Sequence, residues 1–568
     1  MDTKRLALAF GLTIIIFVGW NYVSQKMGWV QQEELPARNA TLGGPAEKSP
    51  IENVAPDAGQ TSASFASDFA PETLKAGAEA GEGRLVQVET PLYKAVFQSG
   101  GGVLRHFSLK GYRVGVEEDS PLVDMISEQA AAQAPFGLIL DGLATWSGLK
   151  WRFEGEDLSL WDADEGTLRF YTEVNGIGIT RELTFSGKSY VVGERLLLSS
   201  AQQRSVNVAF TFGATSLSTD RRTSIFATLR HAVFGGPEPQ PEESQYNPTR
   251  VAWFEKNSFH DENSTSTLAK GLLVQSDVSW MGVMNNYFMG AVSMGDEAAG
   301  AKGRIINGVF HVLVGKTGVA LEAGGSTELR SVYFVGPKEK DQLEATPNNL
   351  QKSLDYGFFS VIARPLVHLL SFFYGFTNNY GLAIILLTIM IKALFWPLSQ
   401  KSYRSMNQLK QLQPMLTKIR EKHKNDKDAM NREVMQLYKT YKVNPAGGCL
   451  PIVVQIPVFF GLYQALLNAI ELRHAPFISN LPFTNLPWLA DLASPDPYLI
   501  TPLIMGGSMF LQQRLSPSSA DPTQAKIMMF MPLIFTLLFL GFPSGLVVYW
   551  LVNNVISIGQ QWWQLRQS

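Results

Sequence analysis

A lysine in the middle of an apolar run is the first residue in this sequence that could do chemistry. Lys392 lies in the stretch LTIMIKALFWP, inside the run 380–398, which is otherwise nearly all apolar and long enough to cross a bilayer as a helix. A charge inside such a span costs at least a few kcal/mol on insertion scales, so something must compensate it. Thr388 lies four residues before Lys392, on the same face of the expected helix.

Amide, hydroxyl and aromatic side chains also occur in the later apolar runs. In lipid, polar groups turn toward the protein interior, so together with Lys392 they could line a hydrated cavity open to the cytoplasm. Taken singly, each group has a simpler interpretation: the lysine could extend its stem toward water, and the amides could join neighbouring helices. The candidate residues are Gln455 in the run 449–470, and Tyr549, Trp550, Asn553 and Ser557 in the run 545–563.

The usual patterns of catalysis and metal binding are missing from the sequence. The seven histidines are scattered, and Cys449 is the only cysteine, so we expect no metal site, no cofactor and no enzyme. The stretch VGKTG at 314–318 lacks the first glycine of a phosphate loop, since position 310 is Phe310. An ion-coupled secondary transporter is the alternative reading, but the five C-terminal apolar runs contain no carboxylate or histidine to carry an ion.

Six apolar runs and the charges beside them predict a polytopic α-helical membrane protein with six transmembrane helices. The first run lies in 1–24, after Lys4 and Arg5, and reads as an uncleaved anchor. The loop 399–447 has eleven basic and four acidic residues, whereas 471–497 has one arginine. Basic loops stay in the cytoplasm, so both termini are expected there. The other five runs are 380–398, 449–470, 498–512, 527–542 and 545–563.

The remaining segments divide by composition and period. Residues 25–83 are rich in Ala, Gly, Glu and Pro and predict a flexible linker. Residues 84–345 alternate apolar and polar residues, as in LRFYTEV at 168–174, which predicts a large β-sandwich outside the cytoplasm. Residues 350–376 predict an amphipathic helix on the membrane surface, with an extra spanning helix as the alternative. The core then covers 377–568.

The cytoplasmic loop 399–447 has its own helical pattern. Two apolar stripes separated by KHKNDKD predict a hairpin of two basic helices, which could be a docking arm or only a solvated spacer. The basic residues that we select as candidate contacts of this arm are Arg404, Lys410, Lys418, Arg420 and Lys439.

Motifs in 350–563 resemble those of the YidC/Oxa1/Alb3 family of membrane protein insertases, in the form found in Gram-negative bacteria. They include NYGLAIILLTIMIKALFWPLS, YKVNPAGGCLPIVVQIPVFFGLY, ELRHAPF and NNVISIGQQ. The resemblance implies that five of the six transmembrane helices form the insertase core, and that the β-domain is a periplasmic supersandwich. It also implies an inner-membrane, multi-pass location.

The resemblance implies a function as well. Such proteins insert and help fold inner-membrane proteins through a hydrophilic groove open to cytoplasm and lipid, alone or with the Sec translocon, without hydrolysing ATP. Implied partners are nascent inner-membrane proteins, Sec components, the ribosome, the signal recognition particle receptor and the bilayer, with no specific nucleic acid. The family's groove charge, usually arginine, falls on Lys392, and its substrate contacts fall on Thr388, Tyr549 and Trp550. The short C-terminal end, WWQLRQS, lacks the family's basic tail.

Overall fold

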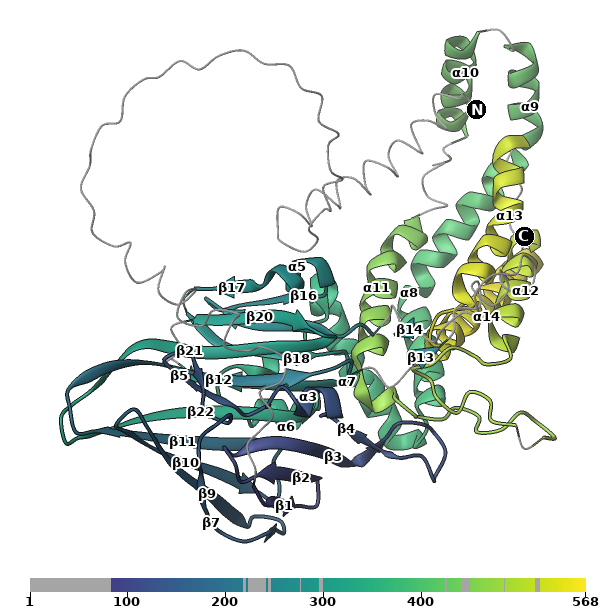
Figure 1. The fold of residues 1–568 in the computed structure, drawn as a ribbon. Coiled ribbons are helices and arrows are strands. Elements are labelled where there is room, and N and C mark those ends of the chain that lie inside the picture. Colours follow the sequence, from purple (N-terminus) through teal and green to yellow (C-terminus); the bar gives the residue numbers. More distant parts are fainter. Residues whose placement is uncertain are drawn as a thin grey trace, which may run out of the picture.

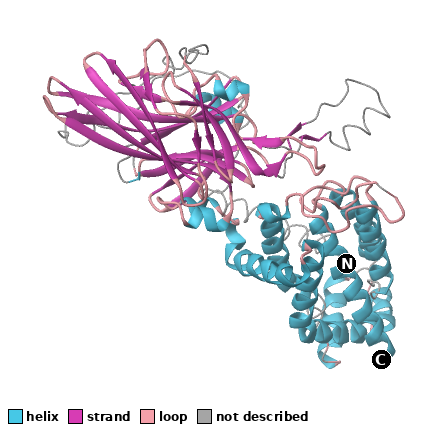
Figure 2. Ribbon diagram, turned by 90° about the horizontal axis from the view of Figure 1, so that it is seen from below, coloured by secondary structure: helices cyan, strands magenta, loops and turns pink. Residues whose placement is uncertain are grey.

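The computed structural model describes residues 83–217, 221–222, 242–243, 247–275, 277–295, 300–423, 426–441, 443, 450–484, 486–515 and 522–567. The predicted anchor at 1–24 and all of the predicted linker at 25–83 except Gly83 lie outside the described residues. Two parts follow along the chain, one built of strands and the other of helices (Figures 1 and 2).

The strand-rich part contains three main sheets whose facing sides share one large apolar core. The nine-stranded sheet has the order β16 (Ser258–Glu262), β15 (Arg250–Glu255), β18 (Val278–Met284), β19 (Phe288–Ser293), β22 (Ser326–Pro337), β11 (Val191–Ser200), β10 (Ile177–Ser186), β9 (Glu165–Val174) and β7 (Arg152–Glu154). The six-stranded sheet has the order β17 (Leu272–Val274), β20 (Gly300–Ile306), β21 (Val309–Leu321), β12 (Arg204–Ala214), β5 (Leu138–Leu140) and β6 (Leu143–Ala144). The five-stranded sheet has the order β4 (Leu122–Asp124), β3 (Val103–Arg113), β2 (Tyr93–Gln98), β1 (Leu85–Glu89) and β8 (Leu158–Ser159).

Smaller elements complete this part, which we call the β-domain (residues 85–345). They are the strand pair β13 (Arg221–Arg222) and β14 (Glu242–Glu243), and the short helices α3 (Glu128–Ala131), α5 (Thr265–Lys270) and α6 (Lys340–Glu344). The alternation of apolar and polar residues predicts a strand with one buried face, and β9 shows this. Its residues Leu168, Phe170 and Val174 are buried, while Arg169 and Glu173 are exposed.

The rest of the described chain consists of helices and the loops that join them. They are η3 (Leu350–Ser353), η4 (Gly357–Phe359), α7 (Ser360–Thr377), α8 (Tyr380–Gln411), α9 (Gln413–Lys422), α10 (Lys427–Thr440), α11 (Leu450–Asn468), η6 (Ile470–Leu472), α12 (Ile500–Leu515), α13 (Pro522–Phe539) and α14 (Ser544–Gln567). All five C-terminal apolar runs are therefore helices. Helix α8 includes Pro397 and continues to Gln411 instead of ending at 398, because most of the residues after 398 are good helix formers. Pro414 lies in the first turn of the next helix, α9.

Two helical stretches in the described part of the chain are long and apolar enough to cross a membrane, judged by length and composition. They are Gly357–Thr377 and Tyr380–Leu409, and Met529–Phe539 is a shorter apolar helix. The first of them includes much of the predicted surface helix 350–376. In α7 the side chains of Ala363, Leu366 and Leu370 are buried, whereas Val361 is 85% exposed. Helix α7 packs against α8 and α11 through the buried side.

The β-domain contacts the helices at the end where α11 finishes. Arg473, only 8% exposed, donates a hydrogen bond of 2.6 Å from Nη2 to the carbonyl oxygen of Arg113, the last residue of β3. The Arg473 guanidinium also lies 5.3 Å from the ring centre of Phe288 on β19. Nearby, the Asn286 side-chain amide donates a hydrogen bond of 3.2 Å to the carbonyl oxygen of Leu467 in α11. This junction, which sequence analysis missed, fixes the end of the helix bundle that faces the β-domain.

Candidate functional site

The predicted charge is buried between two helices. Lys392 on α8 is 8% exposed, and its Nζ donates a hydrogen bond of 2.8 Å to Oγ of Ser557 on α14. Ser557 is itself 3% exposed. The two residues come together because α8 and α14 pack along each other. A hydroxyl relieves part of the cost of removing an ammonium from water, but it carries no compensating negative charge.

Two amide side chains extend this contact to a third helix. Ser557 Oγ donates a hydrogen bond of 2.7 Å to the backbone oxygen of Asn553, one turn earlier. The Asn553 side-chain oxygen in turn accepts a hydrogen bond of 2.6 Å from Nε2 of Gln455 on α11. We call Lys392, Gln455, Asn553 and Ser557 the polar cluster. Four of the predicted site residues are thus joined by hydrogen bonds across α8, α11 and α14.

Thr388 is not part of these hydrogen bonds. It is 1% exposed, and its hydroxyl donates a hydrogen bond of 2.7 Å to the backbone oxygen of Ile384 in its own helix. Threonine commonly satisfies its hydroxyl in this way within a helix. Its position one turn before Lys392 agrees with the spacing in the sequence, but its hydroxyl is already bonded to its own backbone.

Tyr549 and Trp550 lie in an aromatic group beside the polar cluster. Phe459 of α11 contacts both of them, with ring centres 6.5 Å from Tyr549 and 4.8 Å from Trp550. Trp550 also lies 5.2 Å from the ring of Phe539 on α13. Tyr549 is 1% exposed. The two aromatic residues therefore close the polar cluster on the side nearer the start of α14.

Two glutamines continue the polar side of α14 toward its C-terminal end, and sequence analysis did not select them. Gln560 and Gln561 are 5% and 7% exposed. Neither amide atom of Gln560 has a hydrogen-bond partner among the described residues. The spacing was a usable signal, because both lie within one turn of Ser557 at steps of three and four residues. A buried amide without a partner is costly, and it indicates a place for water or another polar group.

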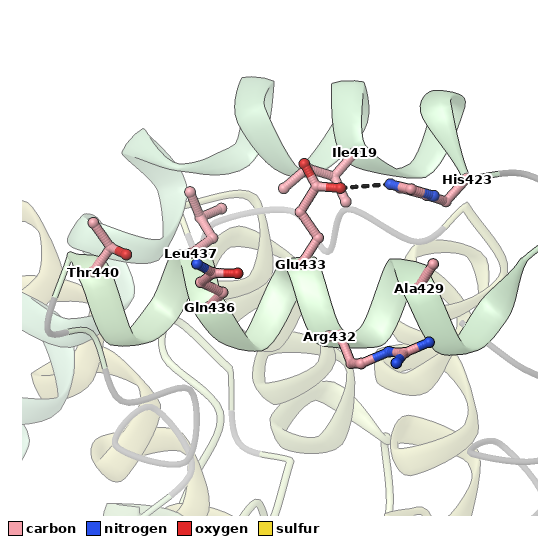
Figure 3. Close-up of a pocket in the computed structure, with 8 residues that line it drawn as sticks. All are labelled: Ile419, His423, Ala429, Arg432, Glu433, Gln436, Leu437 and Thr440. Atoms are coloured by element: carbon pink, nitrogen blue, oxygen red, sulfur yellow. Dashed lines mark hydrogen bonds and ion pairs between the residues drawn. The ribbon is translucent and has the colours of Figure 1, made fainter.

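The hairpin that follows α8 holds an open pocket of about 530 Å³ between α9 and α10. In Figure 3 the His423 ring points to the Glu433 carboxylate across the hairpin, and a dashed line marks their contact. Lys422 adds a hydrogen bond of 3.1 Å to the same carboxylate. These two donors hold the pKa of the Glu433 carboxyl below its usual range. The contact joins α9 and α10 near the turn between them.

The predicted contact residues of the hairpin lie outside that pocket. Arg404, Lys418 and Lys439 are exposed, and Arg420 is half-buried. Lys410 lies in the last part of α8, where only the backbone is described. The basic side chain in the pocket wall is instead Arg432. Of the predicted basic residues whose side chains are described, three are therefore exposed and none lines the pocket.

Within the described ranges, no three His, Cys, Asp or Glu side chains lie close enough to hold a metal ion. What the polar cluster can do is electrostatic: it offers a positive charge and hydrogen-bonding groups inside an apolar bundle.

Comparisons with known proteins agree with these features. The family described as 60Kd inner membrane protein matches residues 372–568, and the family described as YidC periplasmic domain matches residues 85–369. The first match covers the core helices, and the second covers all the sheets of the β-domain.

Full-length relatives are named membrane protein insertase YidC. Membrane protein insertase YidC of Nitratidesulfovibrio vulgaris (strain DP4) is 51% identical over 570 residues, which cover 100% of both chains. The protein of that name from Oleidesulfovibrio alaskensis is 49% identical over 571 residues, again with 100% of both chains covered. A solved structure, "Active YidC insertase crystal structure with the first transmembrane domain resolved", is 17% identical and has a TM-score of 0.34, covering 84% of this chain and 92% of that chain. The relatives and family matches confirm the resemblance seen in the motifs, and this chain belongs to the YidC family of membrane protein insertases.

Proposed function

We propose that this chain inserts membrane proteins into the bacterial inner membrane and assists their folding, and that the polar cluster is where substrates are received. The observation that carries the proposal is the buried hydrogen bond between Lys392 and Ser557. It places inside an apolar bundle an ammonium that has no acidic partner among the described residues. Such a group attracts an acidic or polar segment of a substrate, because the charge acts strongly where water is scarce.

The polar and the aromatic residues of the site have different roles in this proposal. Hydrogen-bonding groups on the hairpin side come from Gln455, Asn553 and Gln560. There the site forms a groove open to cytoplasm and lipid, which water can enter. The amide of Gln560, which has no partner in the described part of the chain, supports such hydration. Tyr549 and Trp550 form the apolar roof. A hydrophilic segment then has only part of the bilayer left to cross, and the substrate's apolar helix leaves sideways because its side chains prefer lipid.

This proposal includes the membrane topology. Six transmembrane helices cross the membrane: the anchor at 1–24 and the five helices of the core at 377–568. Both termini and the hairpin lie in the cytoplasm, because the basic residues concentrate in 399–447. The β-domain lies in the periplasm, and residues 350–376 form the helical connection that lies along its side of the membrane.

The partners proposed for the chain follow from the same account. Nascent inner-membrane proteins are the substrates, and the hairpin, with its exposed Arg404, Lys418 and Lys439, receives the ribosome, the signal recognition particle receptor or the substrate itself. The Sec translocon shares some of the substrates. The proposed activity is not an enzymatic one and uses no cofactor.

Photo-crosslinking tests the site. A photoreactive residue is placed at Gln455, at Trp550, or at Val361 as the control, because Val361 is 85% exposed on α7. Each variant is then given a ribosome-bound membrane protein stalled during insertion. We expect adducts from Gln455 and Trp550 and few from Val361. Equal adducts at all three positions, or none at Gln455 and Trp550, would contradict the proposed site.

A further inference from the structure

The loop between α11 and α12 contains sixteen successive residues without a charged side chain, APFISNLPFTNLPWLA at 475–490. We call residues 480–487 the loop tip. A loop exposed to water is normally rich in polar and charged residues, and this one is rich in Leu, Phe, Pro and Trp. Its composition alone does not identify what covers it, so its geometry and position must decide.

The base of the loop is held firmly by the helix bundle. Backbone hydrogen bonds join Phe477 to Leu489 at 2.9 Å, and the Asn379 side chain, just before α8, donates to the Phe477 oxygen at 3.1 Å. Leu492 is 1% exposed, and its backbone oxygen accepts a hydrogen bond of 2.9 Å from Gly545 at the start of α14. The loop therefore leaves the bundle in a defined direction.

The loop tip is also held by backbone hydrogen bonds, but its apolar side chains are exposed. Leu481 and Leu486 are joined by a backbone hydrogen bond of 2.9 Å, and Asn480 pairs with Pro487 in an isolated bridge. Phe483 at the end is fully exposed, and Leu486 is 50% exposed. A hydrogen-bonded turn that presents a phenylalanine and a leucine outward is unfavourable in water, since both side chains gain from leaving it.

The place of the tip relative to the bundle points to lipid. The loop starts at Arg473, which contacts the β-domain, so it lies at the periplasmic end of the helices. In Figure 1 the loop between α11 and α12 projects sideways from the helix ends, on the side away from the β-domain. A segment that leaves a membrane-spanning bundle sideways at this level runs along the surface of the outer leaflet.

We propose that the loop tip inserts into the interfacial region of the outer leaflet, with Phe483 and Leu486 among the lipid headgroups and upper acyl chains. Aromatic and aliphatic side chains favour this depth, about 5–10 Å into the boundary between headgroups and chains. The absence of charge in 475–490 means that the attraction is apolar and does not depend on anionic lipid. The inserted tip fixes the depth at which the ends of α11 and α12 lie in the bilayer. This role is independent of what the polar cluster binds.

Fluorescence quenching by lipids tests this inference on the full chain. Cys449→Ser provides a background without cysteine, into which Phe483→Cys or Leu486→Cys is introduced and labelled with an environment-sensitive dye. Glu173→Cys, on the exposed side of β9, is the matched control. Each labelled protein is placed at low density in zwitterionic liposomes that contain lipids with a nitroxide either near the headgroup or near the chain end.

We expect blue-shifted emission at positions 483 and 486, with stronger quenching by the shallow nitroxide than by the deep one, and no lipid quenching at 173. Emission typical of water at 483 and 486 would overturn the inference. Blue-shifted emission without quenching by either lipid would overturn it too, because it would show that protein covers the tip. Agreement between the two labelled positions excludes an effect of replacing Phe483 alone.

Discussion

Lys392 and Ser557 are 165 residues apart in the chain, and a hydrogen bond of 2.8 Å joins them inside the helix bundle. The Ser557 hydroxyl donates a hydrogen bond to the backbone oxygen of Asn553, whose side-chain oxygen accepts a hydrogen bond from Gln455. Lys392, which looks isolated in the sequence, therefore has a neutral hydrogen-bonding partner in the folded chain. An acidic substrate segment can replace a hydroxyl at Lys392 more easily than it could replace a carboxylate, because no ion pair has to be broken.

The hydrogen bond between Gln455 and Asn553 should couple α11 to α14 weakly. Gln455→Ala, Asn553→Ala and the double variant form a cycle whose interaction energy we expect to be about 0.6 kcal/mol, as for hydrogen bonds between other membrane helices. Unfolding in mixed micelles measures the three stability changes. Additive effects of the two substitutions would show that the contact contributes nothing, and the Asn554 to Ser508 pair, at 3.1 Å, provides a second cycle for comparison.

Arg473→Ala should loosen the contact between the β-domain and the helices. The variant loses a buried, charge-assisted hydrogen bond to Arg113, worth about 2 kcal/mol in comparable cases. Hydrogen–deuterium exchange of the Val114 and Gly115 amides, both hydrogen-bonded in the structure, should become faster while exchange in β10 and β11 stays unchanged. Arg330→Ala, at a side chain that is 78% exposed, is the control. Unchanged exchange at Val114 would mean that Arg473 does not hold the junction.

Acid should weaken the β-domain through His311. Burial, with a smaller contribution from Arg304, lowers the pKa of His311 to about 4, whereas the unfolded chain has the ordinary value near 6.5. Below about pH 6.5 the unfolded state binds the proton more readily, so stability falls as the pH drops from about 6.5 to about 4 and changes little beyond. The full difference corresponds to about 3 kcal/mol.

Thermal unfolding of the detergent-purified chain at pH 7.5 and pH 5 measures this effect. The midpoint should drop at pH 5, and His311→Gln should reduce the drop, because the variant has no proton to bind at this position. An equal drop in both proteins would assign the acid sensitivity to other groups.

The hairpin should matter beyond its charge. Replacing residues 403–440 by a flexible linker with the same number of Lys and Arg keeps the topology signal but removes the paired helices and the His423 to Glu433 contact. We expect correct topology, seen by protease accessibility, together with defective insertion. Normal insertion by this variant would reduce the hairpin to a passive connection. A chain with only Glu433→Gln separates loss of the Glu433 ion pairs with His423 and Lys422 from loss of the whole hairpin.

The sequence predicted those parts of the structure that follow from local pattern. Period-two alternation located strands such as β9, and apolar length located α8, α11, α12, α13 and α14, because each pattern reflects burial along one element. The apolar run was predicted to end at 398 and a separate helix of the hairpin to follow, whereas α8 continues through both, since the loss of apolar residues does not by itself end a helix. The continuing helix reaches Gln411 because good helix formers follow.

The contacts within the site depend on how helices pack, and the sequence could only suggest them. Spacing placed Thr388 beside Lys392, yet the Thr388 hydroxyl bonds its own backbone, and Ser557 from a distant helix is the partner of the lysine. Arg473 was counted as a lone basic residue in a loop, because nothing in the sequence indicates that its guanidinium reaches a carbonyl of β3. Gln560 was overlooked although its spacing from Ser557 was visible.

Insertion by purified protein in liposomes tests the central claim most directly. The substrate is a single-spanning protein with an acidic tail that must cross the membrane, and the rate is measured for the wild type, Lys392→Arg, Lys392→Ala and Lys392→Glu. Lys392→Arg keeps the charge, so we expect it to retain insertion, while Lys392→Ala and Lys392→Glu impair it, the glutamate most because it repels the tail. If Lys392→Ala inserts this substrate at the wild-type rate, the electrostatic role of the polar cluster is wrong.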